Sequence, residues 1–352
     1  MFDLEKLLER IEPLNEAVMA KTQARLDDLT KPRGSLGVME SIAKKIAGIT
    51  GKVIPSISKK TCILMAGDHG VTEEGVSAYP REVTAQMVLN FLEGGAAMSV
   101  LTRHVGAELV VVDVGVNADF ADNHFLWNKK VAYGTMNMCK GPAMTPEQTF
   151  KALEVGFETV SNCLDEGSEL IGIGEMGIGN TTSSAALLSV FSGASPQEIT
   201  GRGTGVDDER LKLKIGAIEK ALKVNSPNAS NPLETLTKVG GLEIAGLTGV
   251  ILGCAARRVP VVLDGFISGA AALVATHMNP YVKDYLLASH LSEECGHKLM
   301  LEILGVVPIL HMNMRLGEGT GAALVINIIE AALKILKEMA TFSGAGIDGP
   351  TA

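Results

Sequence analysis

The feature that most constrains the fold is an alternation of short apolar runs with helical segments between about residue 60 and residue 310. Each run is rich in β-branched or other aliphatic residues and gives way to glycine or aspartate, as a buried strand does where it ends at a turn. Strands that alternate with helices imply βαβ units, and therefore a parallel sheet covered by helices on both faces. The runs predict strands over residues 61–66, 109–113, 169–173, 259–264 and 306–310.

This pattern predicts an α/β, Rossmann-like fold, in which ligands bind beyond the carboxyl ends of the strands. The chain has 39 glycines in 352 residues, which exceeds the usual level of roughly 7%. Several of them fall near the predicted strand ends, where they allow the backbone to approach a ligand closely. With 46% hydrophobic residues the chain is not disordered. A net charge of −9 and 4% aromatic residues argue against a nucleic-acid partner.

Both ends of the chain have a helical pattern. Apolar residues recur at the helical period in the first 50 residues and again over 322–340. The first pattern breaks at 31–37, where Pro32 and two glycines end one helix and Ser35 is expected to cap the next. We therefore predict two domains, a small helical domain from residues 1–57 with 323–352 and an α/β domain over 58–322.

The cysteines and the N-terminus indicate the compartment. The five cysteines are an odd number, widely spaced and without a C-x-x-C pair, so neither a disulfide framework nor a zinc site is expected. The first residues carry charges of both signs and do not resemble a signal peptide. No apolar run reaches the roughly 18 residues that a membrane helix needs. We predict a soluble, cytoplasmic protein with no membrane partner.

The stretch over residues 172–182 carries the strongest functional signal. A predicted strand enters it and a helix of small residues leaves it, with Asn180 or Thr181 expected to cap that helix. Its four glycines allow backbone N–H groups to face an anion. The stretch also contains G-x-G-x-x-G, but the acidic residue that a dinucleotide site needs about 20 residues later is missing, and Glu175 would repel a pyrophosphate. We favour a ligand loop over a dinucleotide site or a turn formed only for packing.

Two further loops, 201–205 and 317–321, share the sequence G-x-G-T-G, which can form a backbone nest for an anion or a carbonyl. The helix expected after the first loop carries Lys212, which we interpret as a solvated residue. The second loop holds Glu318 between two glycines. A glycine-flanked acid is more often a turn residue than a catalyst, but together with Glu175 it suggests an active site with two carboxylates.

Three aspartates, Asp68, Asp113 and Asp264, each end an apolar strand. Carboxylates at strand ends suit Mg²⁺, although helix caps and turn hydrogen bonds are the commoner roles. No H-E-x-x-H motif or P-loop occurs. We expect no metal, and for Asp68 and Asp264 ligand contact and loop bracing both remain open.

Seven short segments form an ordered set from about residue 30 to residue 330: 31–37, 67–71, 174–182, 238–241, 263–266, 289–290 and 314–323. Each segment alone is modest, but the ordered set is specific. It resembles the nicotinate-nucleotide–dimethylbenzimidazole phosphoribosyltransferases, which make the lower-ligand nucleotide of cobalamin.

The resemblance implies transfer of the 5-phosphoribosyl group from nicotinate mononucleotide to 5,6-dimethylbenzimidazole, giving α-ribazole 5′-phosphate and nicotinate with inversion at the anomeric carbon. It implies that Glu318 is the general base, that Glu175 stabilises the cationic transition state, and that no cofactor takes part. The remaining substrate contacts that it implies are Gly177, Asn180, Gly203, Lys214, Ser292 and Leu316, with Ser77, Tyr79 and Met87 around the incoming base.

Three positions depart from the family pattern. Tyr79 stands where a serine can occur, Met87 where a glutamine can occur, and Cys295 where a lysine is frequent. These departures leave the preferred base open. The resemblance also implies a homodimer whose partners are small-molecule substrates.

Two other classes of function remain to be separated from transfer. An NAD-dependent oxidoreductase would use the glycines of 172–177, and NADH binding would reveal it. A non-catalytic nucleotide sensor would keep the loops without needing Glu318 in the cleft.

Overall fold

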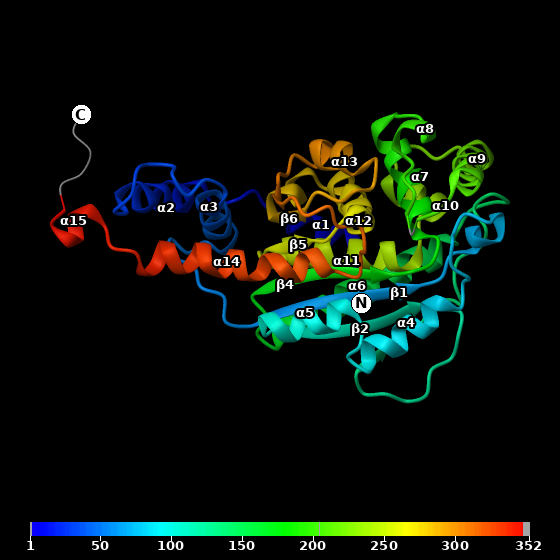
Figure 1. Cartoon of the computed structure of the whole chain (residues 1–352), viewed down its shortest axis with the longest axis horizontal. Coiled ribbons are helices and arrows are strands. Elements are labelled where there is room, and N and C mark those ends of the chain that lie inside the picture. The colour runs from blue at the N-terminus through cyan, green and yellow to red at the C-terminus, as the bar shows by residue number, and fades with distance from the viewer. Residues whose placement is uncertain (1, 204, 348–352) are drawn as a thin grey trace.

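The computed structural model describes residues 2–203 and 205–347, which form a seven-stranded parallel sheet with helices on both faces (Figure 1). The strand order is β3-β2-β1-β4-β5-β6-β7, and every neighbouring pair is parallel. The strands are β1 Lys60–Gly67, β2 Glu108–Gly115, β3 Leu126–Asn128, β4 Leu170–Met176, β5 Val261–Leu263, β6 Leu286–His290 and β7 Pro308–Leu310. The predicted α/β fold is confirmed.

The two faces of the sheet belong to two hydrophobic cores, because successive side chains of a strand point in opposite directions. In β1, Ile63 and Met65 join one core, whereas Leu64 and Ala66 join the other. The first core takes residues from α1 Leu4–Glu9, α6 Pro146–Asp165, α7 Asn180–Ser192, α9 Asp208–Asn225, α10 Pro232–Val239, α11 Leu242–Ala256, α12 Phe266–Met278 and α13 His297–Leu304. The second takes residues from α2 Glu16–Asp28, α3 Val38–Thr50, α4 Val83–Leu92, α5 Ala97–Val105 and α14 Thr320–Glu338.

Four short helical turns complete the described elements: η1 Gly70–Glu74, α8 Pro196–Ile199, η2 Pro280–Tyr285 and α15 Phe342–Ala345. Among the helices that the structure describes, none has the length and apolar character that a membrane crossing requires.

The sheet has a switch point between β1 and β4. These strands are neighbours although they are not consecutive in the chain, so the order of strand addition reverses between them. Connections leave such a point in opposite directions and open a crevice at the carboxyl ends of the two strands. The glycine loop that follows β4 therefore begins at the position where a ligand is expected.

Two of the seven strands were not predicted from the sequence. β6, Leu286–His290, is buried throughout, but its alanine, serine and histidine do not give the β-branched pattern of a strand. β3, Leu126–Asn128, has three residues at the edge of the sheet, and so short a run has no detectable period.

The helices from the two chain ends meet in part. α2 and α3 pack together, α3 packs against α14, and Leu29 bridges to Thr341, whereas α1 packs against α11 (Figure 1). The division into two domains stays a prediction, and residues 348–352 of its second segment lie outside the described residues. The predicted cap was wrong: α3 begins after Gly37, whose φ of 55° is left-handed, because the Ser35 amide instead closes a turn on Pro32.

Candidate active site

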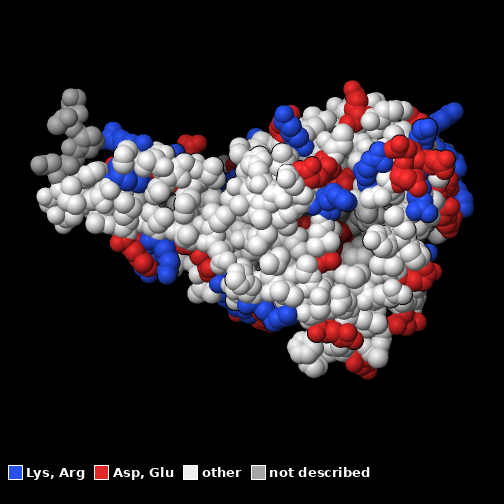
Figure 2. All heavy atoms as spheres, viewed as in Figure 1, with Lys and Arg blue, Asp and Glu red and all other residues white. Residues whose placement is uncertain are grey.

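A cavity of about 330 Å³ opens beyond the carboxyl ends of β4, β5 and β6, and residues of α4 also line it. Figure 2 shows a hollow on this face with acidic side chains inside it and basic side chains at its edge. A smaller space of about 30 Å³ adjoins it and shares the lining residues Gly177, Asn180 and Gly203. The two spaces together form the candidate site.

All of the predicted site residues line one of these two spaces. Lys214 and Ser77 line the smaller space. The residues at the larger cavity are Glu175, Gly177, Asn180, Gly203, Ser292, Leu316, Glu318, Tyr79 and Met87. The structure therefore brings together residues from segments as far apart as 77 and 318.

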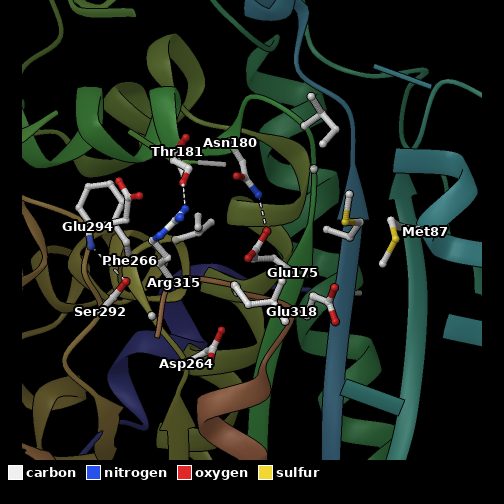
Figure 3. Close-up of a pocket in the computed structure, with 18 of the residues that line it drawn as sticks. Met87, Glu175, Asn180, Thr181, Asp264, Phe266, Ser292, Glu294, Arg315 and Glu318 are labelled. Carbon is white, nitrogen blue, oxygen red and sulfur yellow. Dashed lines mark hydrogen bonds between the residues drawn. The ribbon is translucent and has the colours of Figure 1, made fainter. Parts of the chain in front are cut away.

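Glu175 is the sixth residue of β4, and its side chain is buried in the cavity wall. The Asn180 side chain donates a hydrogen bond to its carboxylate (Figure 3). Burial raises the pKa of Glu175 to about 8, and the nearby carboxylates of Asp264 and Glu243 add to that rise. Asn180 therefore hydrogen-bonds to the Glu175 carboxylate and does not cap the helix. The N-cap of α7 is Gly179, which has no side chain to cap it, so the predicted cap at Asn180 or Thr181 was wrong.

Glu318 lies in a left-handed turn that precedes α14, with φ angles of 83°, 66° and 98° at Gly317, Glu318 and Gly319. The turn sits directly on β4, where a Cβ at Gly174 would overlap the Glu318 carbonyl. Its carboxylate accepts a hydrogen bond of 3.3 Å from the Met98 backbone N–H at the start of α5. Burial raises the pKa of Glu318, and the Met98 hydrogen bond opposes that rise. We call Glu175, Asp264 and Glu318 the carboxylate end of the site.

Lys214 occupies the opposite part of the site, and its side chain is 1% exposed. Its ammonium donates to the Thr181 hydroxyl at 2.9 Å and to the Gly201 carbonyl at 3.0 Å. Burial lowers its pKa to about 8, although the charge of Glu294 opposes the shift. We call Thr181, Gly203 and Lys214 the lysine end. One residue of the predicted G-x-G-T-G loop over 201–205, Thr204, lies outside the described residues.

Neither end neutralises its own charge. Within residues 2–203 and 205–347, no ion pair involves Glu175, Glu318 or Lys214. Each charged group is held only by hydrogen bonds to uncharged partners. The arrangement can receive a ligand that is anionic at one end and develops positive charge at the other.

Comparison with known proteins decides the family. A family model for phosphoribosyltransferases matches residues 11–347. The chain belongs to this phosphoribosyltransferase family. It is 55% identical over 344 residues to the nicotinate-nucleotide–dimethylbenzimidazole phosphoribosyltransferase of Geobacter sulfurreducens, with 98% of both chains covered. It is 52% identical over 345 residues to the enzyme of the same name from Chlorobaculum tepidum, again with 98% of both chains covered.

A solved structure agrees with these relatives. The crystal structure of the nicotinate-nucleotide–dimethylbenzimidazole phosphoribosyltransferase from Thermus thermophilus matches this phosphoribosyltransferase with a TM-score of 0.91 and 43% identity. The match covers 96% of this chain and 100% of that one. The family expected from the seven segments is confirmed, and the chain is a pentosyltransferase enzyme.

The three strand-end aspartates of the transferase all bind backbone N–H groups. Asp113 accepts from Gly115 and Val116, Asp68 from Asn117, and Asp264 from Gly319 and Gly321. In the part of the chain that the structure describes, no group of three or more His, Cys, Asp or Glu side chains is arranged to hold a metal ion. Of the three, Asp264 also lines the cavity.

Several lining residues of the transferase were missed at the sequence level. Arg315 and Phe266 lie inside two of the segments that carried the resemblance, so the sequence did contain a signal for them. The Arg315 guanidinium donates to the Gly203 carbonyl at 3.2 Å. His290 also lines the cavity and lies in a third of these segments, 289–290. Glu294 lines the cavity too, and only the fold, which brings the ends of β5 and β6 together, could reveal it.

Proposed function

We propose that this phosphoribosyltransferase moves the 5-phosphoribosyl group of nicotinate mononucleotide to 5,6-dimethylbenzimidazole, with inversion at the anomeric carbon and with Glu318 as general base. The names of the relatives support this substrate pair. One observation supports the mechanism: two buried carboxylates and one buried ammonium face adjoining cavities of the site, and none of them forms an ion pair with another described residue.

The chemistry of the transfer needs a base and a negative charge at the same end. One ring nitrogen of the incoming benzimidazole forms the new bond to the anomeric carbon. The bond to the pyridinium nitrogen breaks, and its electron pair returns to the pyridine ring, so nicotinate leaves without protonation. The second benzimidazole nitrogen releases its proton to the Glu318 carboxylate. Glu175, oriented by Asn180, stabilises the positive charge that develops on the ribosyl ring.

The lysine end suits the 5′-phosphate. Lys214 provides a point charge, and α7 directs its N-terminus, at Asn180 and Thr181, toward the same space. Desolvation makes an unpaired buried ammonium costly, and a bound phosphate would relieve that cost. The Gly203 backbone lies close to the Lys214 ammonium, because a Cβ added at Gly203 would lie 3.2 Å from the ammonium nitrogen. Ser292 lines the cavity nearby as a further contact.

The incoming base would pack against α4. Val83 and Met87 lie one helical turn apart and both line the cavity, so they offer one apolar face. Figure 3 shows Met87 on the side of the carboxylates that faces away from Ser292 and Glu294. In-line displacement with inversion needs the incoming and leaving rings on opposite sides of the sugar. Leu316, which is exposed at the rim, and Tyr79 would border the entry for these rings.

The test is a direct assay. The protein, nicotinate mononucleotide and 5,6-dimethylbenzimidazole are incubated together, and free nicotinate and α-ribazole 5′-phosphate are measured in equal amounts, with the anomeric configuration determined by NMR. Release of nicotinate that does not depend on the base would indicate hydrolysis and would overturn the proposed transfer. A product with the β configuration would overturn inversion.

The same mixtures, together with a titration of the protein with NADH, separate the other classes of function. Binding of NADH would favour an oxidoreductase, whereas nucleotide binding without any product would favour a sensor. The cytoplasmic location and the homodimer stay predictions from the sequence and its resemblance.

A further inference from the structure

Asp264 makes contacts that the proposed reaction does not use. It follows β5 directly and is 3% exposed. One carboxylate oxygen accepts from the Gly319 N–H at 3.0 Å, and the other accepts from the Gly321 N–H at 2.7 Å. Both donors belong to the turn and first residues of α14, immediately after Glu318. A single side chain from one strand therefore holds the backbone on the C-terminal side of Glu318 at two points.

The turn that carries Glu318 needs such support. A left-handed conformation is unfavourable for a residue with a Cβ and persists only where its surroundings enforce it. Four described non-glycine residues have positive φ, and Glu318 is the one that is buried; Ser226, Arg258 and Asn313 are exposed or half-buried. α14 also lacks a capping side chain of its own, because its N-cap is Gly319. Asp264 supplies the missing acceptors from a different strand.

The position of the Glu318 carboxylate depends on this backbone. Among the described residues only Met98 donates a hydrogen bond to its side chain, and its main chain lies against Gly174. If the turn relaxed toward negative φ, the carboxylate would move away from the Met98 N–H, and the Glu318 main chain would move away from Gly174. We propose that Asp264 is a positioning residue for the general base, acting through the turn at 317–319. The inference rests on the proposed function, because it assigns Asp264 a role through the base of that reaction.

A direct role for Asp264 at the sugar is the alternative, since it lines the cavity. Both of its oxygens are already engaged by backbone N–H groups. Among the described residues, the charged or titratable groups near it include Glu175, Glu318, Cys62 and His290, whose ring nitrogen lies 4.0 Å away. A double-mutant cycle separates the two roles, because a residue that acts only through Glu318 has nothing to contribute once the base has been removed.

The experiment compares Asp264→Asn in wild-type and Glu318→Gln backgrounds, with kcat and KM measured for both substrates. The variant keeps the size of the side chain but loses one acceptor. We expect kcat to fall about 10²-fold, as a small displacement of a catalytic group can cause, with KM unchanged within about threefold. In the Glu318→Gln background we expect a further loss of no more than about twofold. An unchanged kcat in the single variant, or the full loss repeated without Glu318, would overturn the proposal.

Asp113→Asn is the matched control. Asp113 is also buried, accepts from two backbone N–H groups and lies outside both cavities, although both donors share one oxygen and Lys130 pairs with the other. It should lower the melting temperature and leave kcat at the wild-type value. If Asp264→Asn does not fold, hydrogen exchange in the wild-type protein still tests the two hydrogen bonds from Gly319 and Gly321 to Asp264. Rapid exchange of these two amides would contradict the proposal. Absence of product in the wild-type enzyme would instead count against the proposed function.

Discussion

The two ends of the candidate active site each bury a titratable group, and the two groups carry opposite charges when ionised. At the carboxylate end, burial raises the pKa of Glu175 to about 8. At the lysine end, burial lowers the pKa of Lys214 to about 8. Elsewhere the chain pairs buried charge, as between Lys130 and Asp113 at 2.6 Å. In the part of the chain that the structure describes, Glu175 and Lys214 lack such partners, so a substrate of opposite charge can act as the partner of each.

The two ends differ in when the substrate carries the charge that each end would bind. In the proposed reaction the phosphate at the lysine end carries its charge throughout, so Lys214 would act on binding of the nucleotide as well as of the transition state. The positive charge at the carboxylate end grows only as the glycosidic bond breaks. Interactions made only in the transition state raise kcat, whereas uniform binding lowers KM. Variants at the two ends should therefore separate in kinetics.

The largest effect is expected at the base. Glu318→Gln keeps the shape of the side chain but cannot accept the proton, so kcat should fall about 10³-fold, as loss of a general base does, while KM for nicotinate mononucleotide stays close to wild type. Steady-state kinetics with both substrates measures this. Glu302→Gln, an exposed glutamate on α13, is the control, and wild-type turnover in Glu318→Gln would remove the assignment.

The lysine end should respond mainly in KM. Lys214→Met removes a charged hydrogen-bond donor, so KM for nicotinate mononucleotide should rise about 10- to 10²-fold, with a smaller change in kcat. Nicotinate riboside, which lacks the phosphate, should react equally poorly with both enzymes. Lys212→Met, on the exposed face of the same helix, should match wild type. An equal loss with the riboside would show that Lys214 does not act on the phosphate.

The pH dependence should join the two ends in one profile. Below pH about 8 Glu175 gains a proton and loses its negative charge, and above pH about 8 Lys214 loses its proton and its positive charge. kcat/KM for the nucleotide reports the free enzyme, so it should peak near pH 8 and fall about tenfold per pH unit on either side. Lys214→Met should remove the alkaline limb only. An alkaline limb that survives this substitution would have another origin.

The smallest effect is expected at the wall for the incoming base. Met87→Gln places a polar amide at an apolar contact, so KM for 5,6-dimethylbenzimidazole should rise about threefold, in keeping with the modest cost of one such contact. Tyr79→Ser should change it less, because Tyr79 is 52% exposed. Competition between 5,6-dimethylbenzimidazole and unsubstituted benzimidazole measures the selectivity. If the substitutions changed KM for the nucleotide instead, the proposed contact of Met87 and Tyr79 with the incoming base would be wrong.

Local patterns in the sequence predicted much of the fold and identified both catalytic candidates. Apolar runs located five of the strands, since a buried strand has to be apolar along its length. Glycine on both sides of Glu318 marked a turn, and the turn proved to be left-handed. Lys214 has no such signal, because a lysine in a charged helix is usually solvated, and only the resemblance singled it out.

Contacts between distant segments could not be predicted in this way. Asp264 and Gly319 are 55 residues apart, and nothing near either one indicates the other. The expected cap at Thr181 failed for this reason, because its hydroxyl accepts from Lys214, 33 residues away. At Asn180 and Ser35 the competing contacts are local: Asn180 donates to Glu175, and the Ser35 amide closes a turn on Pro32. Chain topology, and not propensity, decides such pairs.

The left-handed φ of Glu318 sets stability and activity against each other at one residue. Glycine or asparagine adopts this conformation more readily and would not bury a carboxylate. In a library of variants selected only for resistance to heating, substitutions of Glu318 should therefore be among the first to accumulate. Its most heat-resistant members would be intact folds that no longer perform the transfer.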